Sequence, residues 1–230
     1  FYDLRLKLSI SERFEHINEF LYSEVELDNR KTGEKLFDYV DPRNRASQIE
    51  MEAAATEHLK AIGAYLKPTF KSVDLKAEPF DVEASIMIPV RNRIRTIRDA
   101  IESALSQKTN FKFNVFIVEN GPDYHSTDGT TELIDEYKND ERVIHIIPNR
   151  RDIGVGNSWN MAAHHPQCGR FIVQLDSDDV YSDEHTLQKF VDAFYEQQCA
   201  MVIGSYMLTD IHKNMLPPGK IDHREWTPEN

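Results

Sequence analysis

The sequence has little cysteine and no long apolar run. Its only cysteines among 230 residues are Cys168 and Cys199, too few for the disulfide framework of a small secreted domain. We therefore expect a reducing compartment, with both thiols packed as small apolar side chains. No stretch approaches the roughly 18 uninterrupted apolar residues that a membrane-spanning helix needs. We expect no transmembrane segment and a cytoplasmic location, with peripheral association at the inner face of the membrane left open.

Basic side chains are also in short supply. The chain has 27 Lys and Arg against 39 Asp and Glu, a formal net charge of -12. Surfaces that bind nucleic acid are usually basic, so we expect no nucleic-acid partner. The chain begins at Phe1 without a methionine and stops at Asn230 in a polar run, and we expect it to be a piece of a longer protein.

Short apolar runs alternate with helix-period segments from Ser85 onward. This pattern is typical of a parallel sheet covered by helices, so the expected fold class is α/β, with an open, mainly parallel sheet sandwiched by helices. Because crossovers are right-handed, the loops that follow the strands share one edge, where ligands of such sheets bind. Strands are expected at 85–90, 113–118, 143–147, 170–175 and 200–204.

The first 82 residues differ in character from the rest. We predict an N-terminal segment over 1–82 and a second domain over 83–230. Apolar residues at three- and four-residue spacing predict a helix over 46–66, with 67–82 as a linker and a strand near 20–25. The predicted apolar face of this helix consists of Ile49, Ala53, Leu59, Ile62 and Leu66.

Three carboxylates follow directly on the predicted buried strand 171–175. Side chains at i and i+2 of a strand end project to one side, so Asp176 and Asp178 should converge, with Asp179 beginning the next turn. Carboxylates this close repel one another, and a hard divalent cation relieves the repulsion. A solvated acidic turn that caps the next helix is the alternative. An EF-hand loop is excluded, since Tyr181 occupies the position that requires glycine.

Four motifs, each at a strand end and in a fixed order, resemble those of family 2 glycosyltransferases. The opening strand is followed by a helix that ends in Ser106 and Gln107, as in that family. The acidic triplet matches the family's DXD motif. The four motifs are Ala84–Asn92, Val118–Gly121 continued by Ser126–Thr130, Asn149–Ala162, and Leu175–Asp179.

The resemblance implies a GT-A-like fold whose Rossmann-like half binds a nucleoside-diphosphate sugar, typically a UDP-sugar. It implies Mn²⁺ or Mg²⁺ held by Asp176, Asp178 and Asp179, and His223 resembles a late histidine that completes the metal shell in some relatives. A bridging cation also fits the charge balance, because an acidic protein cannot otherwise hold a diphosphate beside carboxylates. The donor-binding residues implied are Pro89, Val90, Asn92, Glu119, Asn120, Gly154, Asn160, Asp176 and Ser177.

An inverting transfer to a saccharide or other hydroxyl acceptor is also implied by the resemblance. The base would be a carboxylate in a downstream Glu-Asp motif. Asp210, Asp222 and Glu225 stand in no convincing context, so we expect the catalytic base outside the chain. Residues 1–27 resemble the closing segment of such a domain, which suggests the tail of a preceding transferase domain. A plain helical extension is the alternative.

Three departures from the family pattern leave other functions open. Asn120 replaces an expected acid, residues 122–125 are inserted, and Trp159 stands where the family often has arginine. A nucleotide-sugar-binding module without transfer activity is therefore one alternative. A nucleotidyltransferase is another, although the segment 91–93 supplies charge without the glycine-rich loop typical of that class.

Overall fold

The computed structural model describes residues 1–23, 45–67, 69, 71–76, 78–119, 126–149 and 154–222. The chain divides into two compact units. One spans Ser72–Gly204 and is called the sheet unit below; the other combines Phe1–Lys71 with Ser205–Asn230. The acidic triplet and the strands that precede it all belong to the sheet unit.

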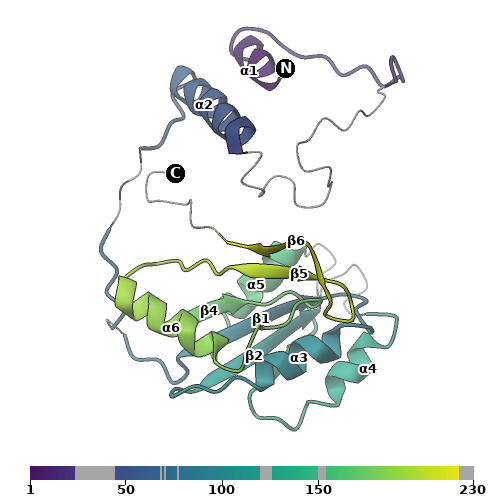
Figure 1. Cartoon of the computed structure of the whole chain (residues 1–230), viewed down its shortest axis with the longest axis vertical. Helices are drawn as coiled ribbons and strands as arrows, with labels where there is room; N and C mark the ends of the chain where they lie inside the picture. The colour runs from purple at the N-terminus through teal and green to yellow at the C-terminus, as the bar shows by residue number, and fades with distance from the viewer. Residues whose placement is uncertain are drawn as a thin grey trace. The chain divides into compact units, whose positions relative to one another are not determined.

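The sheet unit contains four parallel strands in the order β3-β2-β1-β4 (Figure 1). They are β1 (Ala84–Val90), β2 (Phe113–Glu119), β3 (Val143–Ile146) and β4 (Phe171–Gln174). Every residue of β1 and β2 is buried, as near-continuous apolar runs require when both faces of a parallel sheet are covered. The expected α/β class with a parallel sheet is confirmed.

Helices cover both faces of the sheet (Figure 1). Ile86 and Ile88 of β1 pack in one cluster with apolar side chains of α3 (Ile97–Leu105), α4 (Thr130–Asp135) and α6 (Thr186–Gln197). Met87, which lies between them, packs in a second cluster with α5 (Val155–Ala163). Because neighbouring side chains of a strand point to opposite faces, α5 lies on the face opposite to the other three helices.

The direction of the sheet connections reverses between β1 and β4. From β1 the chain passes to β2 and then β3 on one side, and it returns to place β4 on the other side of β1. β1 and β4 are parallel neighbours, so the loops that follow them leave the same edge of the sheet at this switch point, and both lead to helices on one face, α3 and α6. Such a switch point is where open α/β sheets bind ligands.

The predicted fifth strand at 200–204 is wrong. Residues 201–205 form no strand, and the next strands are β5 (Tyr206–Thr209) and β6 (Met215–Ile221), an antiparallel pair in the other unit. Met201 and Ile203 are 72% and 47% exposed. An apolar run becomes a strand only where a neighbouring strand takes up its backbone hydrogen bonds, and the order of the described sheet ends at β4.

The N-terminal region forms two helices, α1 (Tyr2–Leu8) and α2 (Arg45–Ala61), which contact one another. A helix is present where one was expected over 46–66, but it ends at Ala61, before Ile62 and Leu66 of the predicted apolar face. That face is exposed, and α2 has no buried residue. Periodicity fixes which residues share a face and not what covers that face. Of the strand predicted near 20–25, residues 20–23 form none and the remainder lies outside the described residues. No helix in the described part of the chain is long and apolar enough to cross a membrane.

The last part of the expected linker is fastened to the sheet unit. Arg170, directly before β4, donates hydrogen bonds to the carbonyl oxygens of Leu75 and Glu78. Its guanidinium also lies 4.8 Å from the centre of the Phe80 ring. These contacts with one arginine hold Leu75, Glu78 and Phe80 against the start of β4.

Candidate functional site

The loops that follow β1 and β4 meet at the switch point of the sheet. Arg93 Nε, three residues past β1, lies 3.7 Å from Asp178 Oδ2, four residues past β4. Both side chains are about half exposed, so the ion pair stands at the surface and contributes little stability. Its value is geometric, because it locates the acidic turn beside the end of β1.

The acidic turn, residues 176–179, is closed by its own hydrogen bonds. The Asp179 N–H donates to the Asp176 carbonyl at 3.0 Å, and the Gln174 amide donates to Asp176 Oδ1 at 3.0 Å. Ser177 is buried, with 7% of its surface exposed. Partial burial of the carboxyl group and the negative charges of Asp176 and Asp178 raise the pKa of Asp179. The carboxylates are thus close enough to repel.

The chemistry of this donor set fits a hard divalent cation. Carboxylate oxygens are the ligands that Mg²⁺ and Mn²⁺ prefer, and the raised pKa of Asp179 marks negative charge that a cation would neutralise. Within the described residues, no three His, Cys, Asp or Glu side chains are already gathered as a metal shell. His223, the other predicted ligand, lies outside the described residues.

Asn92 joins the end of β1 to the loop that follows β2. It has a positive φ of 52°, a left-handed conformation that asparagine tolerates better than most residues. Its backbone N–H donates to Ser126 Oγ at 3.1 Å, and its side-chain oxygen accepts from the Thr127 N–H at 2.9 Å. The predicted donor-binding residue Asn92 therefore uses its side-chain oxygen to position these two loops.

The polar run after β2 also positions these loops, a role that the sequence did not predict. Asp128 Oδ2 accepts from the Ile94 N–H at 3.1 Å, and Thr130 Oγ1 accepts from the Arg93 N–H at 2.8 Å. Burial raises the pKa of Asp128, but hydrogen bonds from Thr130 and Ile94 outweigh it and the pKa is lowered. The signal in the sequence was a run of Ser, Thr and Asp before a helix, which is typical of turns and caps.

Glu119 ends β2 with a side chain that is fully buried. One carboxylate oxygen accepts a short hydrogen bond from the Ser126 N–H; the other accepts from the Thr131 hydroxyl at 2.8 Å and lies 3.1 Å from His145 Nε2. Burial raises the pKa of Glu119, but hydrogen bonds from His145, Thr131 and Ser126 lower it below its ordinary value. The carboxylate thus faces into the protein. Its neighbour Asn120 lies outside the described residues.

The other predicted donor-binding residues lie on β1 and α5. Pro89 and Val90 are buried in β1, opposite Val118 and Glu119 of β2. Gly154 immediately precedes α5 and Asn160 is exposed on that helix. These four residues therefore lie on or beside two different elements. One is the strand β1, and the other is α5, which packs on the face of the sheet opposite α3.

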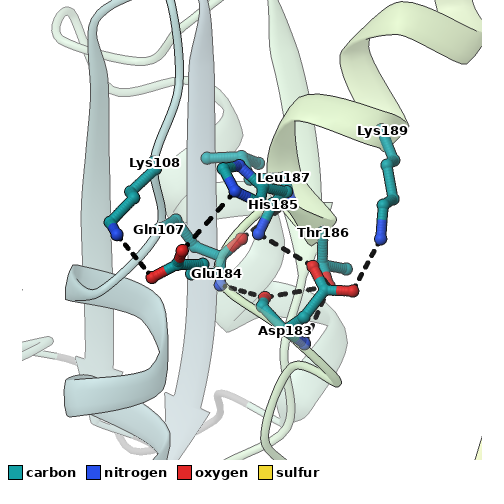
Figure 2. Close-up of polar contacts among 8 residues, drawn as sticks. All are labelled: Gln107, Lys108, Asp183, Glu184, His185, Thr186, Leu187 and Lys189. Atoms are coloured by element: carbon teal, nitrogen blue, oxygen red, sulfur yellow. Dashed lines mark hydrogen bonds and ion pairs between the residues drawn. The ribbon is translucent and has the colours of Figure 1, made fainter.

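A buried glutamine anchors the segment that leads from the acidic turn into α6 (Figure 2). Gln107 is 5% exposed; its amide nitrogen donates to the Asp183 carbonyl and its oxygen accepts from the Leu187 N–H, both at 2.8 Å. The neighbouring Lys108 pairs with Glu184 at 2.7 Å. The Ser-Gln pair that follows α3 is visible in the sequence, but its spacing does not predict these contacts with α6.

A large cavity lies at the opposite edge of the sheet. Its volume is about 1280 Å³, and its lining includes Val82, Lys112 and Gly169, which precede β1, β2 and β4. The acidic turn lies beyond the other ends of the strands. Cavity size alone therefore does not locate the candidate site.

Comparison with known proteins identifies the family. The family model for glycosyl transferase family 2 matches residues 85–227. An uncharacterized glycosyltransferase of Rickettsia felis is 35% identical over 154 residues, 63% of this chain and 24% of that protein. The putative teichuronic acid biosynthesis glycosyltransferase TuaG of Bacillus subtilis is 29% identical over 124 residues, 54% of this chain and 46% of that protein.

The crystal structure of S. aureus TarS 1-349 in complex with UDP aligns at 25% identity and a TM-score of 0.42, over 50% of this chain and 32% of that one. The chain spans less than half the length of the two curated relatives. The matched segment 85–227 includes β1 to β4, the acidic turn and the loops joined by Asn92. The chain belongs to glycosyl transferase family 2.

Proposed function

We propose that the sheet unit binds the donor of a glycosyltransferase reaction, a nucleoside-diphosphate sugar and most simply a UDP-sugar. The observation that carries the proposal is the acidic turn at the switch point, where Asp178 pairs with Arg93 from the loop after β1. Membership of the family supports the reaction class. The turn and the β1 loop would bracket the diphosphate, with the nucleoside over the ends of β1 and β2.

A divalent cation held by Asp176, Asp178 and Asp179 would supply charge neutralisation to the diphosphate as it leaves. The protein's own part is to hold those carboxylates in place. The Gln174 amide orients Asp176, and the buried Ser177 anchors the turn. Arg93 brings a guanidinium group to the same turn.

The proposed chemistry is a single inverting displacement. The acceptor hydroxyl oxygen forms a bond to the anomeric carbon, the bond from that carbon to the diphosphate oxygen breaks, and the diphosphate keeps the electron pair. The hydroxyl proton passes to a carboxylate base, which we place outside this chain. Since TuaG is named for teichuronic acid biosynthesis, we propose a polysaccharide acceptor and a site of action in the cytoplasm, at the inner face of the membrane.

Calorimetric titration with UDP tests the donor site, with and without Mn²⁺. Wild type should bind UDP only when Mn²⁺ is present, and Asp178→Asn should weaken that binding by about tenfold or more, in the range seen when metal sites are perturbed. Asp192→Asn, on the exposed face of α6, is the matched control and should bind as wild type does. Equal binding by all three proteins without metal would refute the proposal.

A nucleotide-sugar-binding module without transfer activity is the second candidate. The inward-facing Glu119 carboxylate favours it. The family pattern has an acid at this strand end, and here that acid binds groups of the protein itself. Incubation of the full-length protein with UDP-sugars distinguishes the two functions. Release of free sugar or transfer to an added glycan excludes the binding module, while Mn²⁺-dependent UDP binding without either product supports it.

A further inference from the structure

His145 connects three elements of the sheet unit. It lies on β3, with 16% of its side chain exposed. Its Nε2 is 3.1 Å from Glu119 Oε1 of β2, and its Nδ1 is 3.7 Å from Asp135 Oδ1 of α4. These two carboxylates are the charged groups that face the imidazole, one on each side of the ring.

The contact with Glu119 fixes the proton on one ring nitrogen. The hydrogen bonds around Glu119 lower its pKa below the ordinary value, so its carboxylate is ionised at neutral pH and only accepts hydrogen bonds. Nε2 of His145 must therefore carry the hydrogen.

A chain of hydrogen bonds leads from this ring to the loop after β1. The carboxylate that His145 meets also accepts from the Ser126 N–H, and Ser126 Oγ accepts from the Asn92 N–H at 3.1 Å. The Asn92 side-chain oxygen in turn accepts a hydrogen bond from the Thr127 N–H at 2.9 Å. Three strands are thus linked, from β3 through β2 to the end of β1.

We propose that His145 is a positioning residue for the donor site, which orients Glu119 and through it the 126–131 loop and Asn92. The inference rests on the proposed function only for its effect on donor binding. Without the Nε2–H donor, the buried Glu119 carboxylate loses one of its partners, and the loop that it holds is expected to shift.

Two variants separate positioning from plain structural support. His145→Gln keeps an amide N–H that can donate to Glu119, whereas His145→Ala removes the donor. His185→Ala, at an exposed histidine at the start of α6, is the matched control. The first readout is the ¹⁵N–¹H resonance of the Ser126 amide at one fixed pH, measured without any ligand.

In His185→Ala the Ser126 resonance should match that of wild type. In a folded His145→Ala it should shift further than in His145→Gln, which keeps the donor. Equal Ser126 shifts in folded His145→Ala and His145→Gln would overturn the proposal, whether or not the protein binds a nucleotide.

The second readout is UDP affinity in the presence of Mn²⁺. His145→Ala should weaken binding by about tenfold, as expected when a buried charged acceptor loses one partner, and His145→Gln should restore most of the affinity. Unchanged affinity in a folded His145→Ala would contradict positioning. If wild type binds no UDP, the proposed function fails, and the Ser126 resonance alone decides the role of His145.

Discussion

The Gln107 side chain satisfies the backbone of Leu187, 80 positions further along the sequence, through a hydrogen bond of 2.8 Å. Leu187 is the second residue of α6, where a backbone N–H has no partner within its own helix. His185, at the N-cap position, makes no side-chain cap. A residue that follows α3 therefore caps α6, and it fixes where the segment after the acidic turn enters that helix.

Removal of this cap should cost stability. We expect Gln107→Ala to lower the free energy of unfolding by about 1–3 kcal/mol, because the N–H of Leu187 and the carbonyl of Asp183 lose buried partners. Urea denaturation followed by circular dichroism measures the change. Gln197→Ala, at the exposed end of α6, should stay close to wild type, and equal stability of the two variants would contradict the capping role.

Glu119→Gln should destabilise the protein and change its acid sensitivity. A Gln side chain keeps one acceptor but turns an NH₂ group toward a donor, so we expect a loss of about 1–3 kcal/mol. Since the folded-state pKa of Glu119 is lowered, its stabilisation is present above the unfolded pKa of about 4.3 and is lost as pH falls through the folded value. Unfolding curves between pH 2.5 and 6 should show this acid-dependent loss of stability in wild type and in the exposed control Glu132→Gln, but not in Glu119→Gln.

Asp179→Asn should stabilise the metal-free protein at neutral pH. Burial and the charges of Asp176 and Asp178 raise the folded-state pKa of Asp179, so its contribution to stability falls as pH rises from the unfolded pKa of about 3.9 through the folded value. Thermal unfolding at pH 7 should show a higher midpoint for the variant than for wild type. Added Mn²⁺ should raise the wild-type midpoint more than that of Asp179→Asn; a larger response in the variant would argue against a cation at this turn.

Gly169→Ala should disrupt the junction before β4. A Cβ atom at Gly169 would lie 2.9 Å from the backbone carbon of Ala84, and neither backbone can shift easily in a buried sheet, so we expect a loss of about 1–3 kcal/mol. Gly156→Ala is the matched control, because a Cβ atom there meets nothing within 4 Å. Alanine in α5 should be neutral or stabilise by about 0.5–1 kcal/mol. Chemical denaturation of both variants checks the contrast.

The strands and helices of the sheet unit follow from local patterns. The run Ser85–Val90 is apolar at every position but the first, which is how a strand buried on both faces reads. The three- and four-residue spacing of Ile94, Ile97, Ile101, Ala104 and Leu105 predicts an amphipathic helix, and Ile97, Ile101 and Ala104 form part of the buried stripe of α3, whereas Ile94 precedes the helix and is 40% exposed. The run at 200–204 is apolar as well, but no local pattern shows whether a neighbouring strand is within reach.

The candidate site likewise has features that local sequence predicts and contacts that it does not. The sequence alone determined that three carboxylates follow a buried strand and that polar loops end the other strands, because strand ends and turns are encoded by neighbouring residues. Only the tertiary structure decided that Asp178 meets Arg93, that Asn92 and Glu119 hold loops together, and that His145 completes that network. Those contacts depend on the order of strands in the sheet, which brings residues distant in sequence within hydrogen-bonding distance and which no local spacing records.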